Sequence, residues 1–365
     1  MAADDWAVIV GVRWYPGLGN LDGPLRDASA FADWVMARNG GDVPPGNVRL
    51  ILSDADDPQY GSADEARPIV TEVQAAFDSI ARVSQANEKA GAGLRVGRRL
   101  YLYLAGHGYE PALNLFPLLS ANQTALLMAN ASREAPGYHV GGRGYADWFF
   151  YAGFFDEVLL FMDCCREVDR QSAPNPPHRK LNPAPDVLEK VRGFYAWGTK
   201  WDRLTREKPL PPDNQVRGIF TATLLDGLRG AAADASGRVT AASLGVYLAG
   251  NMKKYLSAAE QADTDLGDPD YWVHPQPGTQ LVIATLPTAT LHVRPPAALA
   301  DRDVLVLNTV SYTAVPPAAS GPPAWDYQVP RGNYLVQLIR RGQPPFIDAF
   351  QPLTVDGPGE IDVIF

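Results

Sequence analysis

The chain has 365 residues, 46% of them hydrophobic and 20% charged, so it is long enough for about two globular domains with hydrophobic cores. Its net charge of -9 and pI near 5.1 argue against a protein that binds nucleic acid without sequence preference, because such a protein needs a basic surface. No stretch approaches the roughly eighteen uninterrupted apolar residues of a membrane-spanning helix, so we expect no membrane partner.

The first five residues and the two cysteines indicate the cellular compartment of the protein. Met-Ala-Ala-Asp-Asp is acidic where a secretory signal is basic, which predicts that the protein is not exported. Cys164 and Cys165 are the only cysteines, and a disulfide between neighbours has strained geometry and closes almost no loop. Free thiols are typical of reducing compartments, so we expect a cytoplasmic protein.

The N-terminal part reads as alternating strands and helices. Residues 6–12 are a short apolar, β-branched run that predicts a buried strand. Residues 24–38 place apolar side chains three and four positions apart, which predicts an amphipathic helix. Residues 48–52 predict a second strand, and residues 68–83 predict a second helix with one apolar face.

Two later apolar runs end in chemically active residues. Residues 100–105 lead into Gly106-His107-Gly108, and the run after Glu157 leads into Asp163-Cys164-Cys165-Arg166, with a helix predicted at residues 145–155 between them. The separation leaves room for a parallel βαβ crossover. Because parallel strands end at the same edge of a sheet, we expect a histidine and a cysteine to meet there.

The segment after the cysteines is rich in proline. Residues 171–186 contain five prolines, which break regular elements and predict a mobile surface loop before the next strand at residues 193–198. A cleavage linker and an uncut loop are both compatible with this composition. The basic residues available for cleavage in or near this segment are Arg170, Arg179, Lys180 and Lys190.

The C-terminal part has a different residue pattern. From about residue 271, short β-rich runs alternate with proline and glycine clusters, which predicts a small all-β, sandwich-like domain without a catalytic constellation. We therefore predict an α/β domain over residues 1–275, with a mostly parallel sheet flanked by helices, and an accessory β domain over residues 276–365. Such a β domain commonly serves as a spacer or as a docking surface for a regulatory partner.

The histidine and cysteine motifs resemble those of the caspase/metacaspase superfamily of cysteine peptidases. Residues 6–12, 21–27 and 218–230 are similar to further segments of that family in the same order, so the resemblance covers roughly residues 5–258. It implies a caspase-like fold and an endopeptidase that acts on protein or peptide substrates. Bacterial proteins of this type act in regulated cell death or defence.

The resemblance also assigns the catalytic roles. Cys165, the third residue of Asp-Cys-Cys, aligns with the nucleophile, which makes Cys164 a bystander, and His107 is the base. The N–H groups of Gly108 and Cys165 would form the oxyanion hole, since a glycine lets the substrate carbonyl approach. No third group that orients the histidine is identifiable from the sequence.

The specificity residues follow from the same resemblance. Asp163 occupies the position at which metacaspases carry an aspartate that pairs with arginine or lysine before the scissile bond. Asp202 falls near a second acidic position of that pocket, and two carboxylates favour a guanidinium through charge-assisted bonds. Glu167 departs from the family, which has a small residue there, and would narrow the pocket or add an acidic wall.

Several alternatives remain open at this stage. Asp163 could instead cap the turn that follows it, and the whole chain could be a catalytically silent or partner-gated binding module that recruits partners through its β domain. We expect no cofactor and no metal site, because the remaining histidines show no metal-ligand spacing. These histidines are His139, His178, His274 and His292. Calcium activation stays open, although Asp54, Asp56 and Asp57 do not form a defined ligand loop.

Overall fold

The chain divides into two compact units in a computed structural model. The first comprises Met1–Leu224 with Leu248–Gly278, and the second comprises Leu225–Tyr247 with Thr279–Phe365. The last segment of the second unit starts close to the predicted boundary at residue 276, and residues 225–247 cluster with it. The structure describes residues 4–365 except 55–59, 61, 113–122, 201, 212, 235, 264–265, 310–313, 319–324 and 341–345.

A six-stranded sheet organises the first unit. Its strand order is β13-β9-β7-β3-β1-β2, and every neighbouring pair is parallel except β13 with β9. The predicted mostly parallel sheet is therefore confirmed. The strands are β1 (Trp6–Gly11), β2 (Val48–Leu52), β3 (Gly97–Ala105), β7 (Phe155–Asp163), β9 (Arg192–Trp197) and β13 (Asp270–His274).

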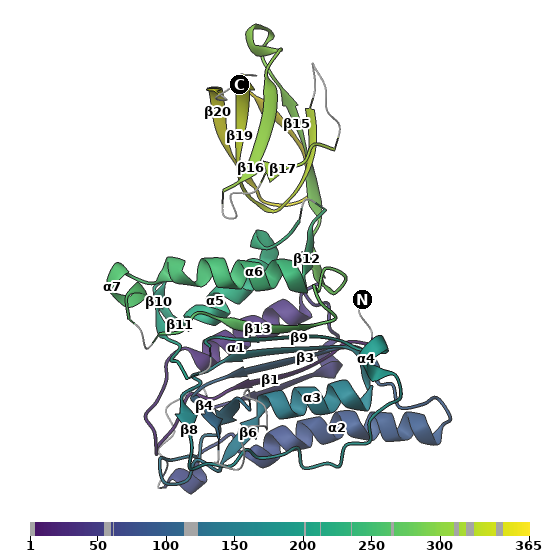
Figure 1. The fold of residues 1–365 in the computed structure, drawn as a ribbon, viewed down its shortest axis with the longest axis vertical. Helices are drawn as coiled ribbons and strands as arrows, with labels where there is room; N and C mark the ends of the chain where they lie inside the picture. Colours follow the sequence, from purple (N-terminus) through teal and green to yellow (C-terminus); the bar gives the residue numbers. More distant parts are fainter. Residues whose placement is uncertain are drawn as a thin grey trace. The chain divides into compact units, whose positions relative to one another are not determined.

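Helices cover both faces of this sheet (Figure 1). Successive side chains of a strand point to opposite faces, so Leu102 of β3 packs in the core that includes α2 and α3, whereas Tyr103 stacks on Phe31 of α1 with ring centroids 4.6 Å apart. The predicted helices are confirmed with small shifts of their ends. The α-helices described in the two units together are α1 (Pro24–Met36), α2 (Val70–Lys89), α3 (Gly142–Ala152), α4 (Val187–Lys190), α5 (Ile219–Asp226), α6 (Ala241–Asn251) and α7 (Ala258–Gln261).

Short strands follow the carboxyl ends of the main sheet. A four-stranded sheet has the order β6-β5-β4-β8, and a separate hairpin pairs β10 with β11. The sequence patterns did not predict these elements, because strands of two to four residues are too short to show a period. The strands are β4 (Gly108–Pro111), β5 (Ala125–Leu127), β6 (His139–Gly141), β8 (Val168–Asp169), β10 (Glu207–Leu210) and β11 (Gln215–Gly218).

The second unit carries the predicted β structure. Two sheets, β18-β15-β21 and β17-β16-β19-β20, share one apolar core, which confirms a sandwich-like arrangement. A further ribbon pairs β12 with β14. The strands are β12 (Arg238–Thr240), β14 (Val282–Thr285), β15 (Thr288–Arg294), β16 (Asp303–Asn308), β17 (Ala314–Val315), β18 (Trp325–Pro330), β19 (Gly332–Arg340), β20 (Phe346–Val355) and β21 (Gly359–Ile364).

The proline-rich segment, residues 171–186, is fully described and contains no helix or strand, as predicted. It is nevertheless bonded to the body of the first unit. The backbone N–H of Asn175 donates to His139 Nε2 at 3.0 Å, and the side chains of His178 and Arg179 both pair with Asp78 at 2.9 Å. Its predicted mobility and cleavage stay predictions, but any movement must first break these contacts.

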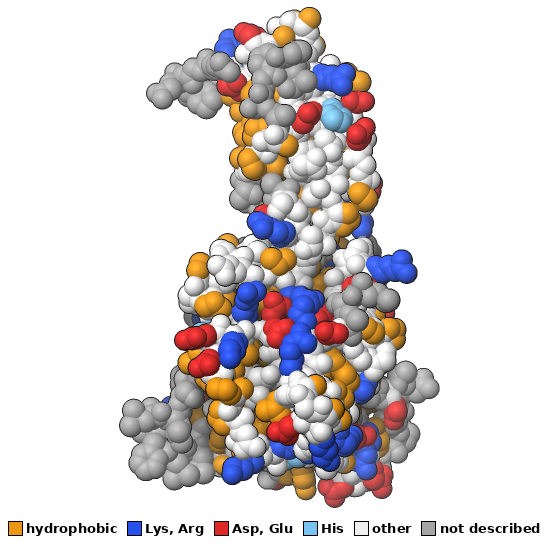
Figure 2. Space-filling view, turned by 90° about the vertical axis from the view of Figure 1, so that its right-hand side faces the viewer, with side chains coloured by type: hydrophobic (Ala, Val, Ile, Leu, Met, Phe, Trp, Pro, Cys, Tyr) orange, Lys and Arg blue, Asp and Glu red, His pale blue; other side chains and the backbone are white. Residues whose placement is uncertain are grey.

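Basic and acidic side chains gather together on one side of the first unit, in the lower part of Figure 2. Ion pairs occur near the amino ends of the sheet strands, where Arg95 pairs with Asp156 and Arg99 with Glu157. The candidate catalytic residues all follow the carboxyl ends of these strands. Among the described residues, none of the helices is long and apolar enough to cross a membrane.

Candidate active site

Strands β3 and β7 bring the predicted base and nucleophile to one edge of the sheet. They are adjacent and parallel, and Ala105 lies opposite Asp163 in their register. His107 and Cys165 each follow two residues later, so they leave the sheet at the same level. Gly106 lies between strand and histidine with φ of 152°, and a Cβ there would be 2.3 Å from the Tyr15 hydroxyl, so glycine is required.

The backbone of His107 is fixed through Tyr15. The His107 N–H donates to the Tyr15 hydroxyl at 3.0 Å, and this hydroxyl donates to the Leu127 carbonyl at 2.9 Å. The two rings also meet edge to face, with centroids 4.7 Å apart. A fully buried tyrosine therefore sets the position of the histidine.

The third group that the sequence left unassigned is a backbone carbonyl. Nε2 of His107 lies 2.9 Å from the Gly19 oxygen. Because a carbonyl only accepts hydrogen bonds, Nε2 carries the proton and Nδ1 is the unprotonated, basic nitrogen. Burial lowers the pKa of His107, and the Gly19 bond and the charge of Glu207 act in the opposite direction. The imidazole is therefore neutral near pH 7.

The two cysteines lie in different surroundings. Cys164 is 1% exposed and packs beneath Gly108, where a Cβ would lie 2.5 Å from the Cys164 sulfur. Cys165 is half-buried, and its thiol lies 3.8 Å from the Thr205 carbonyl oxygen. Burial raises the pKa of Cys165 to about 11 and that of Cys164 well above its usual range. Cys165 is thus the more accessible thiol, and it is neutral at rest.

The backbone ladder beside β4 bears on the predicted oxyanion hole. The N–H groups of Gly106, Glu110 and Ala112 donate to the carbonyls of Asp163, Glu167 and Asp169. Backbone N–H groups two residues apart point the same way along a strand. In all three hydrogen bonds the acceptor follows the donor by the same number of residues. The same spacing sets Gly108 opposite Cys165, between the first and the second of these hydrogen bonds. At Cys165 the chain has left β7 and has not yet entered β8. The Gly108 N–H is therefore directed toward the Cys165 segment.

Asp163 belongs to a group of three carboxylates, which we call the acidic cluster: Asp27, Asp163 and Glu207. Asp163 Oδ2 accepts bonds from the N–H of Thr221 at 3.1 Å and from its hydroxyl at 2.6 Å. Asp27 Oδ2 accepts from the Gly218 N–H at 2.7 Å.

Electrostatics couple the three carboxylates. Burial and the charge of Glu207 raise the pKa of Asp163 to about 6. Burial, followed by the charge of Asp163, raises the pKa of Asp27 well above its usual value. Nearby negative charge thus makes Asp163 and Asp27 harder to ionise, and a cation near them would be stabilised.

The structure does not bring Asp202 to Asp163. Asp202 is exposed with φ of 58°, and its Oδ1 accepts from the Val168 N–H at 3.2 Å. Asp27 lies beside Asp163 instead. The signal that could have found it is the acidic residue in the first turn of the first predicted helix. The contacts of Asp163 with Thr221 also show that it caps α5 rather than the turn that follows Asp163 itself.

The two residues after Cys165 point in opposite directions. Arg166 is fully buried, donates to the Thr199 carbonyl at 3.1 Å and pairs with Asp270 at 3.1 Å. Glu167 is exposed, and its negative charge is one cause of the raised pKa of Cys165. Arg166 therefore fixes the chain behind the nucleophile, while Glu167 lies on the solvent side.

The other polar residues named from the sequence were considered as metal ligands. Among the described residues, no group of three or more His, Cys, Asp or Glu side chains is arranged to hold a metal ion. Asp56 and Asp57 lie outside the described residues. His139 is buried and bonded to the Tyr109 hydroxyl at 2.8 Å, which is a structural use of that histidine.

No family model matches the chain. A curated relative described as a probable protease, from a Desulfuromonadales bacterium, is 25% identical over 231 residues, which cover 62% of this chain and 26% of that protein. The chain thus spans about a quarter of the length of this relative. A solved structure from Geobacter sulfurreducens is 15% identical with a TM-score of 0.44, covering 77% of this chain and 98% of that one. Caspase-1 from Spodoptera frugiperda is 13% identical with a TM-score of 0.40, covering 74% and 88%.

Proposed function

We propose that this protein is a cysteine endopeptidase in which Cys165 is the nucleophile and His107 the general base. The observation that carries the proposal is the placement of these two residues at equal height beyond neighbouring parallel strands, with the Gly108 N–H directed toward Cys165. The curated relative is itself described as a probable protease, which supports the reaction class.

The steps follow from the protonation states of the two side chains. The Cys165 thiol transfers its proton to Nδ1 of His107 as the sulfur bonds to the substrate carbonyl carbon. The N–H groups of Gly108 and Cys165 stabilise the resulting oxyanion. The imidazolium then protonates the leaving nitrogen as the carbon–nitrogen bond breaks, and water hydrolyses the thioester with His107 as base.

The acidic cluster supports cleavage after arginine or lysine. Asp163 is two residues before the nucleophile, Glu207 adds negative charge close to it, and the Asp27 carboxyl lies beside it. A guanidinium or ammonium would relieve the mutual repulsion of these carboxylates. A substrate aspartate at the same place would add a further negative charge, so we expect it to be rejected.

Fluorogenic peptides ending in Arg, Lys or Asp test both parts of this proposal. The intact protein is expected to release the fluorophore after Arg or Lys, and His107→Gln is expected to release none. Cleavage after Asp alone would contradict the proposed recognition of Arg or Lys by the acidic cluster. Equal rates of peptide hydrolysis in the intact protein and in folded His107→Gln would contradict the proposed Cys165–His107 dyad.

The raised pKa of Asp163 makes substrate binding depend on pH. Because burial raises this pKa to about 6, Asp163 is charged at pH 7.5 and becomes protonated as the pH falls through 6. We expect KM for an Arg peptide to rise by about tenfold between pH 7.5 and pH 5. Inhibition constants of a simple arginine amide over this range measure the effect without turnover, and a flat profile would contradict it.

One observation favours a gated form of the same enzyme. The Cys165 thiol points to the Thr205 carbonyl and the His107 Nε2 to the Gly19 carbonyl, so both groups rest neutral and bonded elsewhere. We propose that an activating event moves Thr205 away from the thiol. Rates of Cys165 alkylation, measured with and without calcium, would report such a change, and equal rates would exclude calcium as the trigger.

A further inference from the structure

We propose that Glu207 is a positioning residue for His107: by binding the backbone at the end of the loop after β1, it holds the Gly19 carbonyl that orients the imidazole. The inference rests on the proposed Cys165–His107 dyad. It assigns to Glu207 a role in base orientation that is separate from its charge in the acidic cluster.

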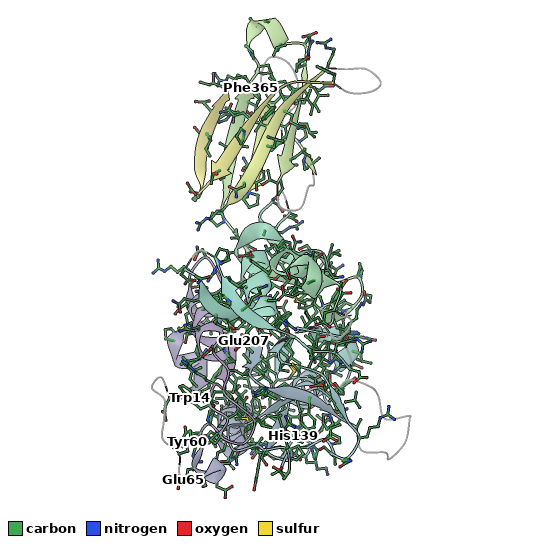
Figure 3. All side chains as sticks on the ribbon, turned by 90° about the vertical axis from the view of Figure 1, so that its left-hand side faces the viewer. Trp14, Tyr60, Glu65, His139, Glu207 and Phe365 are labelled. Atoms are coloured by element: carbon green, nitrogen blue, oxygen red, sulfur yellow. The ribbon has the colours of Figure 1, made fainter. Side chains whose placement is uncertain are left out.

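The contacts of Glu207 are made to two consecutive amides. Its Oε1 accepts from the Asp22 N–H at 2.9 Å and its Oε2 from the Gly23 N–H at 2.7 Å. These amides precede α1, and a carboxylate at a helix N-terminus is also favoured by the helix dipole. A Cβ on Gly23 would lie 2.8 Å from Glu207 Oε2, so glycine is needed for this approach. Glu207 is labelled in Figure 3.

The loop that Glu207 closes is compact and contains Gly19. Its other end is held by Tyr15, whose N–H donates to Asn20 Oδ1 at 2.9 Å and whose carbonyl accepts from the Gly19 N–H at 2.9 Å. Gly19 has φ of 102°, a conformation that other residues rarely adopt. The loop therefore has one anchor at Tyr15 and a second at Glu207, and Gly19 presents its carbonyl to His107 between them.

The segment that leads into β10 contacts Cys165, and the first residue of β10 contacts the loop that holds His107. Thr205, just before β10, contacts the Cys165 thiol through its carbonyl, and Glu207 supports the loop that holds His107. Side chains alternate along the strand, and the neighbouring Arg206 and Lys208 instead pair with Glu260 on α7. This segment is held from two sides, which suits an element that sets the geometry between a base and a nucleophile.

The charge of Glu207 gives the proposal a spectroscopic signature. Among the groups that face His107, Glu207 is the carboxylate that favours its protonated form, while burial favours the neutral form and the Gly19 carbonyl supports the protonated one. Tyr15, whose ring contacts the imidazole, is neutral at these pH values because burial raises its pKa. Removing the charge of Glu207 should therefore move the titration of His107 to lower pH.

The experiment compares Glu207→Gln, Glu207→Asp and the control Asp213→Asn in the full chain. Asp213 is an exposed acid in the same hairpin, and it is not among the groups that shift His107. The imidazole titration is followed by NMR, with the His107 signal assigned by its loss in His107→Gln. Turnover of an Arg peptide is measured in parallel.

In Glu207→Gln we expect the His107 titration to move to lower pH and kcat to fall by about tenfold, in addition to any rise in KM from the loss of one carboxylate of the acidic cluster. Glu207→Asp keeps the charge but is too short to reach both amides, so we expect it to lose kcat with little change in the titration. Asp213→Asn should match the unmodified protein in both measurements.

Three results would overturn the inference: an unchanged His107 titration in folded Glu207→Gln, an effect confined to KM, or full kcat in Glu207→Asp. Failure of the proposed dyad looks different, because hydrolysis would then survive in His107→Gln. In that case the imidazole titration of Glu207→Gln still decides whether Glu207 acts on His107.

Discussion

Replacing Cys165 by alanine is expected to lower peptide hydrolysis by on the order of 10⁴-fold or more, since removal of a nucleophile leaves only binding and oxyanion stabilisation. Cys165 is the half-buried thiol that follows β7, and the ladder beside β4 sets it opposite the Gly108 N–H. The measurement is the initial rate with an Arg peptide at saturating concentration. Circular dichroism should show that the variant remains folded.

Cys164→Ala is the matched control, because it removes the neighbouring thiol from the same segment. Cys164 is 1% exposed and lies under Gly108, so its loss should cost about 1 kcal/mol of stability and leave most of the activity. Alkylation with iodoacetamide should label Cys165 faster than Cys164. If activity disappeared in Cys164→Ala and survived in Cys165→Ala, the assignment of the nucleophile would be reversed.

The central sheet could be predicted from the sequence because its strands are nearly continuous apolar runs. β3 and β7 are buried on both faces, and each ends where a polar or glycine-containing motif begins. The same pattern predicts that His107 and Cys165 lie at one edge of the sheet. The ends of the helices shifted by a few residues, because capping contacts with distant parts of the chain decide where a helix stops.

The parts of the site that the sequence missed are made by backbone atoms and by distant contacts. The Gly19 carbonyl that orients His107 leaves no signal in residue type, apart from a glycine in a loop. Asp27 was visible only as an acid in a helix turn, and its approach to Asp163 depends on how α1 packs on the sheet. Asp202 was chosen by its position in the resembled family, and the hydrogen bond that its Oδ1 accepts from the Val168 N–H could not be read from the sequence.

The proline-rich segment, residues 171–186, shows a similar limit of prediction from sequence. Five prolines correctly predict the absence of regular structure in residues 171–186, because proline removes a donor and fixes the backbone. Composition does not reveal that Asn175 bonds to His139 or that His178 and Arg179 share Asp78. Such contacts depend on residues more than thirty positions away along the chain.

Replacing Glu157 by glutamine is expected to lower the free energy of unfolding of the first unit by about 3–5 kcal/mol, because it removes the carboxylate that is paired directly with a buried guanidinium. Glu157 lies opposite Arg99 on neighbouring strands, and the closest N–O distance between them is 2.6 Å. Arg99 is 2% exposed and Glu157 is 7% exposed, so water cannot replace the lost carboxylate. Chemical denaturation, followed by the tryptophan fluorescence of this unit, measures the change.

The neighbouring acid offers the control that separates burial from charge. Asp156 pairs with Arg95 at 2.7 Å, but both side chains are nearly half exposed, so Asp156→Asn should cost less than about 1 kcal/mol. The double variant Arg99→Met with Glu157→Leu removes both buried charges at once and should recover most of the loss. Equal effects of Glu157→Gln and Asp156→Asn would mean that the Arg99–Glu157 pair is solvated, and that the amino end of β7 is far more open than its packing shows.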